Sequence, residues 1–103
     1  MEQTESYGLG GAGMILAERQ RQIVQEGWTP EHDDEQADQA LCWAAMCYLR
    51  EALDMDGIFD WPWDASWWKP SDDPIRNLVK AGALIAAEID CLTRANQQGT
   101  ATQ

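Results

Sequence analysis

The sequence predicts an all-α protein, a three-helix bundle with a tryptophan-rich loop packed between helices 2 and 3. In three stretches, apolar residues recur at steps of three and four, which is the spacing of one helix face. No stretch shows the strict alternation of apolar and polar residues that marks a strand. Four of the six tryptophans lie within eight residues, between the second and third stretch. A chain of 103 residues is long enough for one domain with a modest core.

The first predicted helix spans residues 14–26 and opens a single helical domain of residues 14–94. Residues 1–13 hold four glycines and few side chains that a core could bury, so we expect a flexible N-terminal arm. Leu16 and Ile23 form a narrow apolar seam on an otherwise polar helix. Gly27 suits the left-handed residue that ends a helix, and Trp28 is expected to fold back as a hydrophobic anchor.

The second predicted helix runs from Asp34 to Leu53. Pro30 keeps the preceding loop from continuing as helix, and the acids after it can cap the helix start. Two neighbouring rows of this helix are apolar, and a helix that is apolar over so much of its circumference is usually the most buried one. The rows are Ala37, Leu41, Ala44, Ala45, Tyr48 and Ala52, and then Cys42, Met46, Leu49 and Leu53.

The third predicted helix runs from Pro74 to Arg94, and we expect the rest of the protein to pack on it. Ser71, Asp72 and Asp73 offer capping oxygens and negative charge at its start, where a proline is also well suited. One apolar stripe follows the helix through Leu78, Gly82, Ile85, Ile89 and Leu92. Residues 95–103 are predicted to form a flexible tail.

Charge is the most unusual bulk property of the chain. Eighteen acids against seven bases give a net charge of −11 and a pI near 4.1. Phosphates would repel such a chain, so we expect no direct binding to nucleic acid or to membranes. Docking on a basic protein surface and simple solubility both remain open. The three cysteines form no CxxC pair, and no secretory signal or eighteen-residue apolar run is found, so we expect a cytoplasmic protein with reduced thiols.

The tryptophan-rich loop is the first candidate site. A cluster this dense is either a lid plugged into the helical core or a binding surface, since tryptophan is enriched both at protein-binding hot spots and where bases stack. Both interpretations stay open. The residues assigned to partner binding are Asp54, Asp56, Asp60, Trp61, Trp63, Asp64, Trp67 and Trp68.

An acidic cluster before the second helix is the second candidate site. Glu31, His32, Asp33 and Asp34 offer the oxygen-rich ligand set that Mg²⁺ or Mn²⁺ prefers. The ordinary alternative is that acids gather at a helix start because the dipole favours them. All-α pyrophosphohydrolases of the MazG type carry ExxE and ExxD motifs on two helices, and this chain shows one ExxD. No nucleophile elbow, P-loop or serine triad is present, so no catalytic residue is assigned.

Five segments carry a family resemblance: ERQRQI (18–23), EGWTPEHDD (26–34), WPW (61–63), WWKP (67–70) and LVKAGALI (78–85). Over residues 16–94 the chain resembles a family of small uncharacterised bacteriophage and prophage proteins. In that family, the positions of Gln36, Gln39 and Ala40 are often His, Gly and Glu, which would enrich the acidic cluster. Their absence here favours a binding role over an enzymatic one.

Two functions follow from these observations. The first is a small acidic phage accessory protein that binds the basic surface of a host protein, inhibiting a defence or nucleic-acid-handling factor in the host cytoplasm as anti-CRISPR-type inhibitors do. It needs no cofactor. The alternative is a nucleotide-binding or metal-dependent nucleotide pyrophosphohydrolase-like protein that uses the acidic cluster, Glu88 and tryptophan stacking with Mg or Mn. Exposed apolar surface on so small a protein would favour a homodimer.

Overall fold

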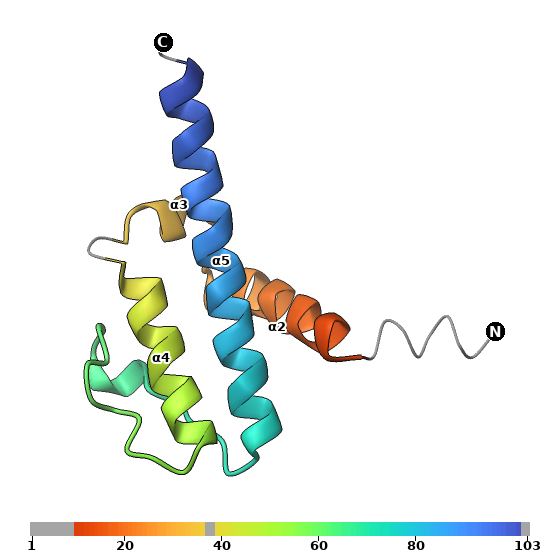
Figure 1. The fold of residues 1–103 in the computed structure, drawn as a ribbon, viewed down its shortest axis with the longest axis vertical. Coiled ribbons are helices and arrows are strands. Elements are labelled where there is room, and N and C mark those ends of the chain that lie inside the picture. Colours follow the sequence, from red (N-terminus) through yellow and green to blue (C-terminus); the bar gives the residue numbers. More distant parts are fainter. Residues whose placement is uncertain (1–9, 37–38, 102–103) are drawn as a thin grey trace, which may run out of the picture.

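The computed structural model describes residues 10–36 and 39–101, the last four of them as backbone only, and this part of the chain is all-helical without a strand (Figure 1). The predicted all-α class is therefore confirmed. Over these described ranges, four α-helices and one 3-10 turn replace the three predicted helices. They are α2 (Gly11–Glu26), α3 (Pro30–Asp34), α4 (Ala40–Ala52), η1 (Ala65–Trp67) and α5 (Pro74–Ala101). Residues 1–9 of the predicted N-terminal arm lie outside the described residues. Helix α2 begins at Gly11, three residues before the predicted start at Met14.

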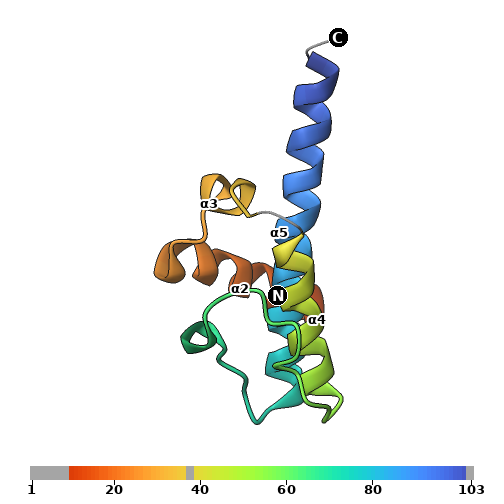
Figure 2. The ribbon, with the colours of Figure 1, turned by 90° about the vertical axis from the view of Figure 1, so that its left-hand side faces the viewer.

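The helices form two layers. In one layer α4 and α5 lie side by side, and α5 also contacts α2 and α3. Figure 2 shows α2, α3 and much of the segment of residues 53–73 on one side of the α4–α5 pair, and no other described helix lies on the opposite side. α5 is therefore the element on which the other helices pack, and it continues through residues 95–101, where the sequence predicted a tail.

The helix ends follow local chemistry. Gly27 ends α2 with a φ of 76°, as its position in the sequence predicted. The predicted continuous helix from Asp34 to Leu53 is wrong, because α3 stops at Asp34 and α4 starts only at Ala40. Gln39 adopts a left-handed φ of 60°, which no α-helix can continue through. At the start of α5, Asp73 accepts a hydrogen bond from the backbone N–H of Ile75 at 2.9 Å.

The core is built of small residues covered by aromatic ones. α4 and α5 meet through a buried cluster of Leu41, Ala44, Ala45, Tyr48, Ala81, Leu84 and Ala87. Tyr48 carries two indoles of the loop: its ring centroid lies 5.7 Å from that of Trp61 and 4.8 Å from that of Trp68. Trp63 packs on the same cluster, while Trp67 stays 43% exposed. The loop is thus partly core and partly surface.

The apolar stripe recognised on α5 does not form the core. Leu78, Ile85 and Ile89 are all exposed, whereas the buried face carries Ala81, Leu84 and Ala87. The reason is steric, since alanines let α4 and α5 approach closely and the larger side chains are left outside. In α2 the expected seam of Leu16 and Ile23 is not the buried face, because Leu16 is 59% exposed and Ile23 is only half-buried. The buried residues of α2 are Glu18, Arg19 and Gln22.

Candidate functional site

A buried ion pair joins α2 to α3. The Arg19 guanidinium donates to the Asp33 carboxylate, and the exposed fractions of the two side chains are only 9% and 0%. Arg19 also donates to the backbone carbonyl oxygen of Trp28 at 3.1 Å. This pair fixes the turn between the two helices and so determines where the Trp28 ring lies.

A second ionic cluster, around Glu18, stabilises the end of α2. Glu18 accepts hydrogen bonds from Arg21 at 2.9 Å and from Arg76 of α5. Burial acts to raise the pKa of Glu18, but the hydrogen bonds from the two arginines outweigh it, and the pKa is lowered. Arg21 in turn donates to Glu26 at 3.1 Å, which holds the Glu26 carboxylate in place.

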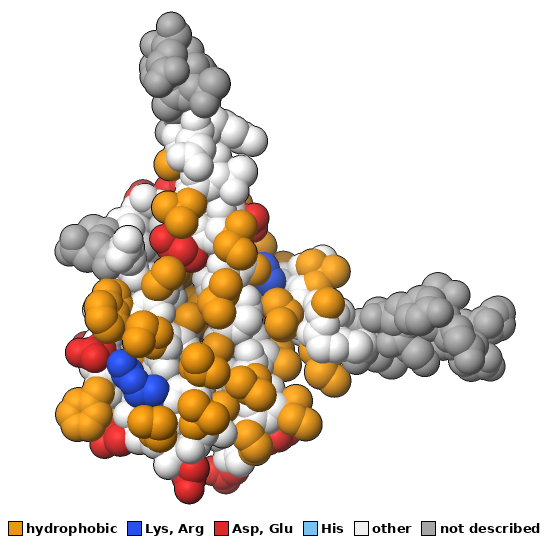
Figure 3. All heavy atoms as spheres, in the orientation of Figure 1, with side chains coloured by type: hydrophobic (Ala, Val, Ile, Leu, Met, Phe, Trp, Pro, Cys, Tyr) orange, Lys and Arg blue, Asp and Glu red, His pale blue; other side chains and the backbone are white. Residues whose placement is uncertain are grey.

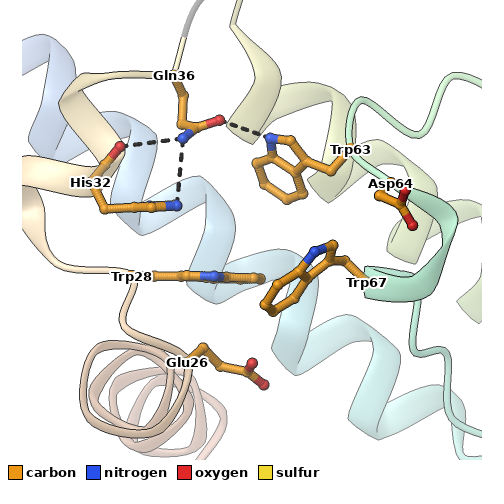
Figure 4. A pocket seen from close by; sticks show the side chains of 7 residues that line it. All are labelled: Glu26, Trp28, His32, Gln36, Trp63, Asp64 and Trp67. Atoms are coloured by element: carbon orange, nitrogen blue, oxygen red, sulfur yellow. Dashed lines mark hydrogen bonds between the residues drawn. The ribbon is translucent and has the colours of Figure 1, made fainter.

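These contacts position one wall of an open pocket of about 420 Å³ (Figure 4). The Trp28 ring stacks on the His32 ring, with 5° between their planes and 6.3 Å between their centroids. The Trp63 ring packs against the Trp28 ring, with 5.6 Å between their centroids and 50° between their planes. The complete lining is Glu26, Trp28, His32, Gln36, Trp63, Asp64 and Trp67.

The amide of Gln36 ties α3 to the tryptophan-rich loop across the pocket. Its Oε1 accepts from the Trp63 indole N–H at 2.7 Å, and its Nε2 donates to the His32 carbonyl at 3.3 Å. The Nε2 also lies 3.5 Å from the His32 Nε2 (Figure 4). Because both ends of the amide are engaged within the protein, Gln36 serves to hold the walls together.

Two carboxylates stand at the rim of this pocket. Glu26 lies on one side, and Asp64 lies beside Trp67 on the other (Figure 4). A hydrogen bond from the backbone N–H of Ser66, at 2.8 Å, lowers the pKa of Asp64 and keeps it ionised at neutral pH. Among the described residues that line the pocket, none is a lysine or an arginine. The pocket therefore offers aromatic faces and anionic acceptors.

The structure does not bring the predicted metal ligands together. Glu31 is exposed, Asp33 is paired with Arg19, and Asp34 accepts from Arg94 at 2.7 Å. His32 lines the pocket, with its Nδ1 3.3 Å from Asp33 Oδ1. In the part of the chain that the structure describes, no group of three His, Cys, Asp or Glu residues could hold a metal ion.

Glu88, which the nucleotide hypothesis added to the acidic cluster, lines a different hollow. This hollow lies between α3 and α5, measures about 420 Å³ and also includes Asp33, Asp34 and Cys91. Burial is the largest cause that raises the pKa of the Cys91 thiol to about 11. Asp33 and Asp34 are bound by arginines, and none of the described residues that line this hollow is aromatic, so it is a poorer candidate site than the tryptophan pocket.

Only part of the predicted partner-binding set lines the pocket. Trp63, Asp64 and Trp67 line it, whereas Trp61 and Trp68 pack on Tyr48. Asp54 and Asp56 are exposed in the turn after α4, and Asp60 lies 3.4 Å from Arg50.

Three pocket residues lie outside the predicted sites, and they are Glu26, Trp28 and Gln36. The sequence predicted Trp28 only as a hydrophobic anchor. The Gly27-Trp28 pair directly after a helix was the feature that could have indicated a role in the site. Gln36 gave no signal, since its role depends on a partner 27 residues away.

Comparisons with known proteins add no relative. No protein family model matches the chain, and neither a curated protein nor a solved structure is found to be similar. Among the described residues, no helix combines the length and apolar character needed to cross a bilayer.

Proposed function

We propose that this protein acts by binding, and that it anchors a basic side chain of a protein partner in the tryptophan pocket. One observation carries the proposal: three indoles and two rim carboxylates converge on one open cavity whose described lining contains no lysine or arginine. An aromatic face attracts a cation through its quadrupole, and a carboxylate at the rim accepts its N–H groups.

The chain itself contains an example of the interaction. The Lys69 ammonium lies 5.5 Å from the centroid of the Trp67 ring, within cation–π range. Such contacts contribute about 0.5–1 kcal/mol when exposed and about 2 kcal/mol when desolvated. A pocket with three indoles allows several of them at once, which is typical of the aromatic centres of binding hot spots.

Overall charge supports the same partner chemistry. A chain at −11 attracts basic surfaces over a distance of roughly 8–10 Å at moderate salt, which speeds their encounter. The carboxylates of Asp54 and Asp56, in the turn after α4, are exposed and add to the negative charge of the surface.

The family resemblance suggests the setting. We propose a phage-encoded accessory protein that works in the host cytoplasm. Its partner would be a host defence or nucleic-acid-handling protein, as for anti-CRISPR-type inhibitors, because such proteins carry basic surfaces rich in arginine and lysine. By occupying that surface, the protein would exclude the nucleic acid.

Binding of short peptides tests the proposal without knowledge of the partner. Intrinsic tryptophan fluorescence is titrated with the peptide Gly-Arg-Gly, its lysine analogue and its citrulline analogue, in which a neutral urea replaces the guanidinium. Saturable binding of the first two, weakened at least about tenfold with citrulline, is expected. The double variant Glu26→Gln/Asp64→Asn should lose this preference. The control Asp72→Asn/Asp90→Asn removes the same charge at exposed positions outside the pocket and should keep it.

Equal binding of the arginine and citrulline peptides would refute the proposal, as would equal losses in the two double variants. The second outcome would mean that net charge, and not the pocket, attracts the peptide. Trp67→Ala should also weaken the binding of Gly-Arg-Gly. The fold should tolerate this change, because the Trp67 ring is 43% exposed and is not among those that pack on the core cluster.

A nucleotide is the second candidate ligand. The nearly parallel Trp28–His32 pair gives a flat wall for a base. A small adjoining hollow of about 20 Å³ is lined by Arg21, Lys69 and Lys80 together with Glu18 and Glu26. In that hollow the Gln22 Oε1 is buried without a hydrogen-bond partner among the described residues. Thermal shift with a panel of nucleotides, with and without Mg²⁺ or Mn²⁺, tests this candidate. A shift with one nucleotide, and none with the basic peptides, would favour it over the proposal above.

A further inference from the structure

The uncovered side of the α4–α5 pair is an apolar surface, which we call the α4–α5 face. Figure 2 shows α2 and α3 on the opposite side of this pair, and Figure 3, which views the uncovered side, shows hydrophobic side chains spread over both helices. Its large exposed residues are Trp43, Met46, Leu49, Leu53, Ile75, Leu78, Ile85, Ile89 and Leu92.

The exposed positions of this face are apolar almost without interruption. From Ile75 to Ile89, every exposed residue of α5 is isoleucine or leucine. From Leu41 to Leu49, every exposed residue of α4 is also apolar. Arg76 and Lys80 of α5 are half-buried and contact Glu18 and the backbone of Lys69 in the other layer. A chain with eighteen acids thus keeps one broad face mainly apolar, with only a few charged side chains among the hydrophobic ones (Figure 3).

The area of the face matches that of a protein interface. Its nine large side chains are each between 40% and 63% exposed. If a large side chain presents about 150 Å² in full, the nine half-exposed ones present roughly 700 Å². A standard interface buries about 800 Å² per partner, whereas the largest apolar patch of a typical monomer is about 300–600 Å².

We propose that a second copy of this chain covers the α4–α5 face. Two chains at −11 repel each other, and they meet with the least repulsion on this face, where most exposed side chains are apolar. A basic partner would find few acids to pair with there.

The spacing on α5 suits an identical partner. Ile75, Leu78, Ile85, Ile89 and Leu92 occupy the alternating three- and four-residue steps of a coiled-coil seam. The remaining position is Gly82, where the Ile15 side chain of α2 packs against the helix. Two copies related by a two-fold axis would pair α4 and α5 with their equivalents in a four-helix bundle.

This dimer leaves the tryptophan pocket open. The residues that line the pocket come from residues 26–36 and 63–67, in the layer on the other side of α4 and α5. The dimer would therefore carry two pockets on its outer sides, and a partner with two basic sites could engage both.

Mass measurement tests the inference on the full chain. Light scattering coupled to size exclusion should give twice 11.6 kDa, about 23 kDa, at micromolar concentration. Ile85→Asp/Ile89→Asp should give the monomer mass with unchanged helical circular dichroism, because both side chains are exposed in one copy. The control Val24→Asp changes a side chain that is 81% exposed on α2 and should remain a dimer.

Other outcomes overturn the inference. A wild-type mass of 11.6 kDa up to about 100 μM would do so, as would a dimer that survives the double aspartate change or one that Val24→Asp breaks. If the aspartate variant loses helix, Ile85→Gln/Ile89→Gln is measured in its place, with the same expected monomer. Binding of Gly-Arg-Gly to the monomeric variant is expected to be unchanged, so failure of this inference is distinguishable from failure of the proposed function.

Discussion

Replacing Asp33 by alanine should destabilise the protein strongly. Its carboxylate is fully buried and pairs with Arg19, whose side chain is 9% exposed. Removing one partner of a buried pair leaves the other charge uncompensated, which costs about 3–5 kcal/mol. With a urea slope of about 1–3 kcal/mol/M, the unfolding midpoint should fall by at least about 1 M. The midpoint is measured by circular dichroism at pH 7 and one fixed protein concentration.

The neighbouring acid provides the matched control. Asp34 carries the same charge one residue away and also accepts from an arginine, but its side chain is exposed. Asp34→Ala should therefore leave the midpoint within the error of the measurement, because water replaces the lost partner. An Asp33→Ala midpoint equal to that of the wild type, or equal losses in the two variants, would refute the assignment of a structural role to the buried pair.

Three further predictions follow from the same structure. The lowered pKa of Glu18 means that the folded state binds a proton at this carboxylate less readily than the unfolded state does. The stabilisation from Glu18 is therefore complete above the ordinary pKa of 4.5 and is lost as the pH falls below that value. The urea midpoints of the wild type and Glu18→Gln should differ most at pH 7 and converge toward pH 3, and a constant difference would contradict this. Gly57→Ala should lower the free energy of unfolding, measured by urea titration, by about 1–3 kcal/mol, because a Cβ at residue 57 meets the backbone carbonyl of Cys47. An unchanged free energy of unfolding would show that this contact relaxes freely. The Cys91 thiol, with a pKa of about 11, should react with iodoacetamide at pH 8 far more slowly than in the urea-unfolded chain, as followed by mass spectrometry, and equal rates would contradict the burial.

Local chemistry made much of the fold predictable. The left-handed glycine at residue 27 and the proline at residue 74 mark a helix end and a helix start that the structure reproduces. The break before α4 could not be predicted, because Gln39 takes a conformation that glycine or asparagine usually supplies.

Periodicity identified the apolar face of α5 but not what covers it. The spacing of Leu78, Ile85 and Ile89 shows that one side of the helix is apolar, and that pattern is the same for a core and for an interface. Ala81 and Ala87, which form the true core face, were less prominent because alanine carries little hydrophobic signal.

The candidate site was predictable only where its residues are close in sequence. Trp63, Asp64 and Trp67 belong to one loop and were expected to act together. Trp28 and Gln36 come from another part of the chain and join them through tertiary contacts that no local pattern encodes.

The most direct test of the central claim is an NMR titration of the six tryptophan indole N–H groups with Gly-Arg-Gly. We predict saturable chemical-shift changes at Trp28, Trp63 and Trp67, and none at Trp43, which lies on the α4–α5 face away from the pocket. The citrulline peptide should leave all six resonances nearly unmoved. Shifts that are absent, that are confined to Trp43, or that are equally large with citrulline would contradict the account.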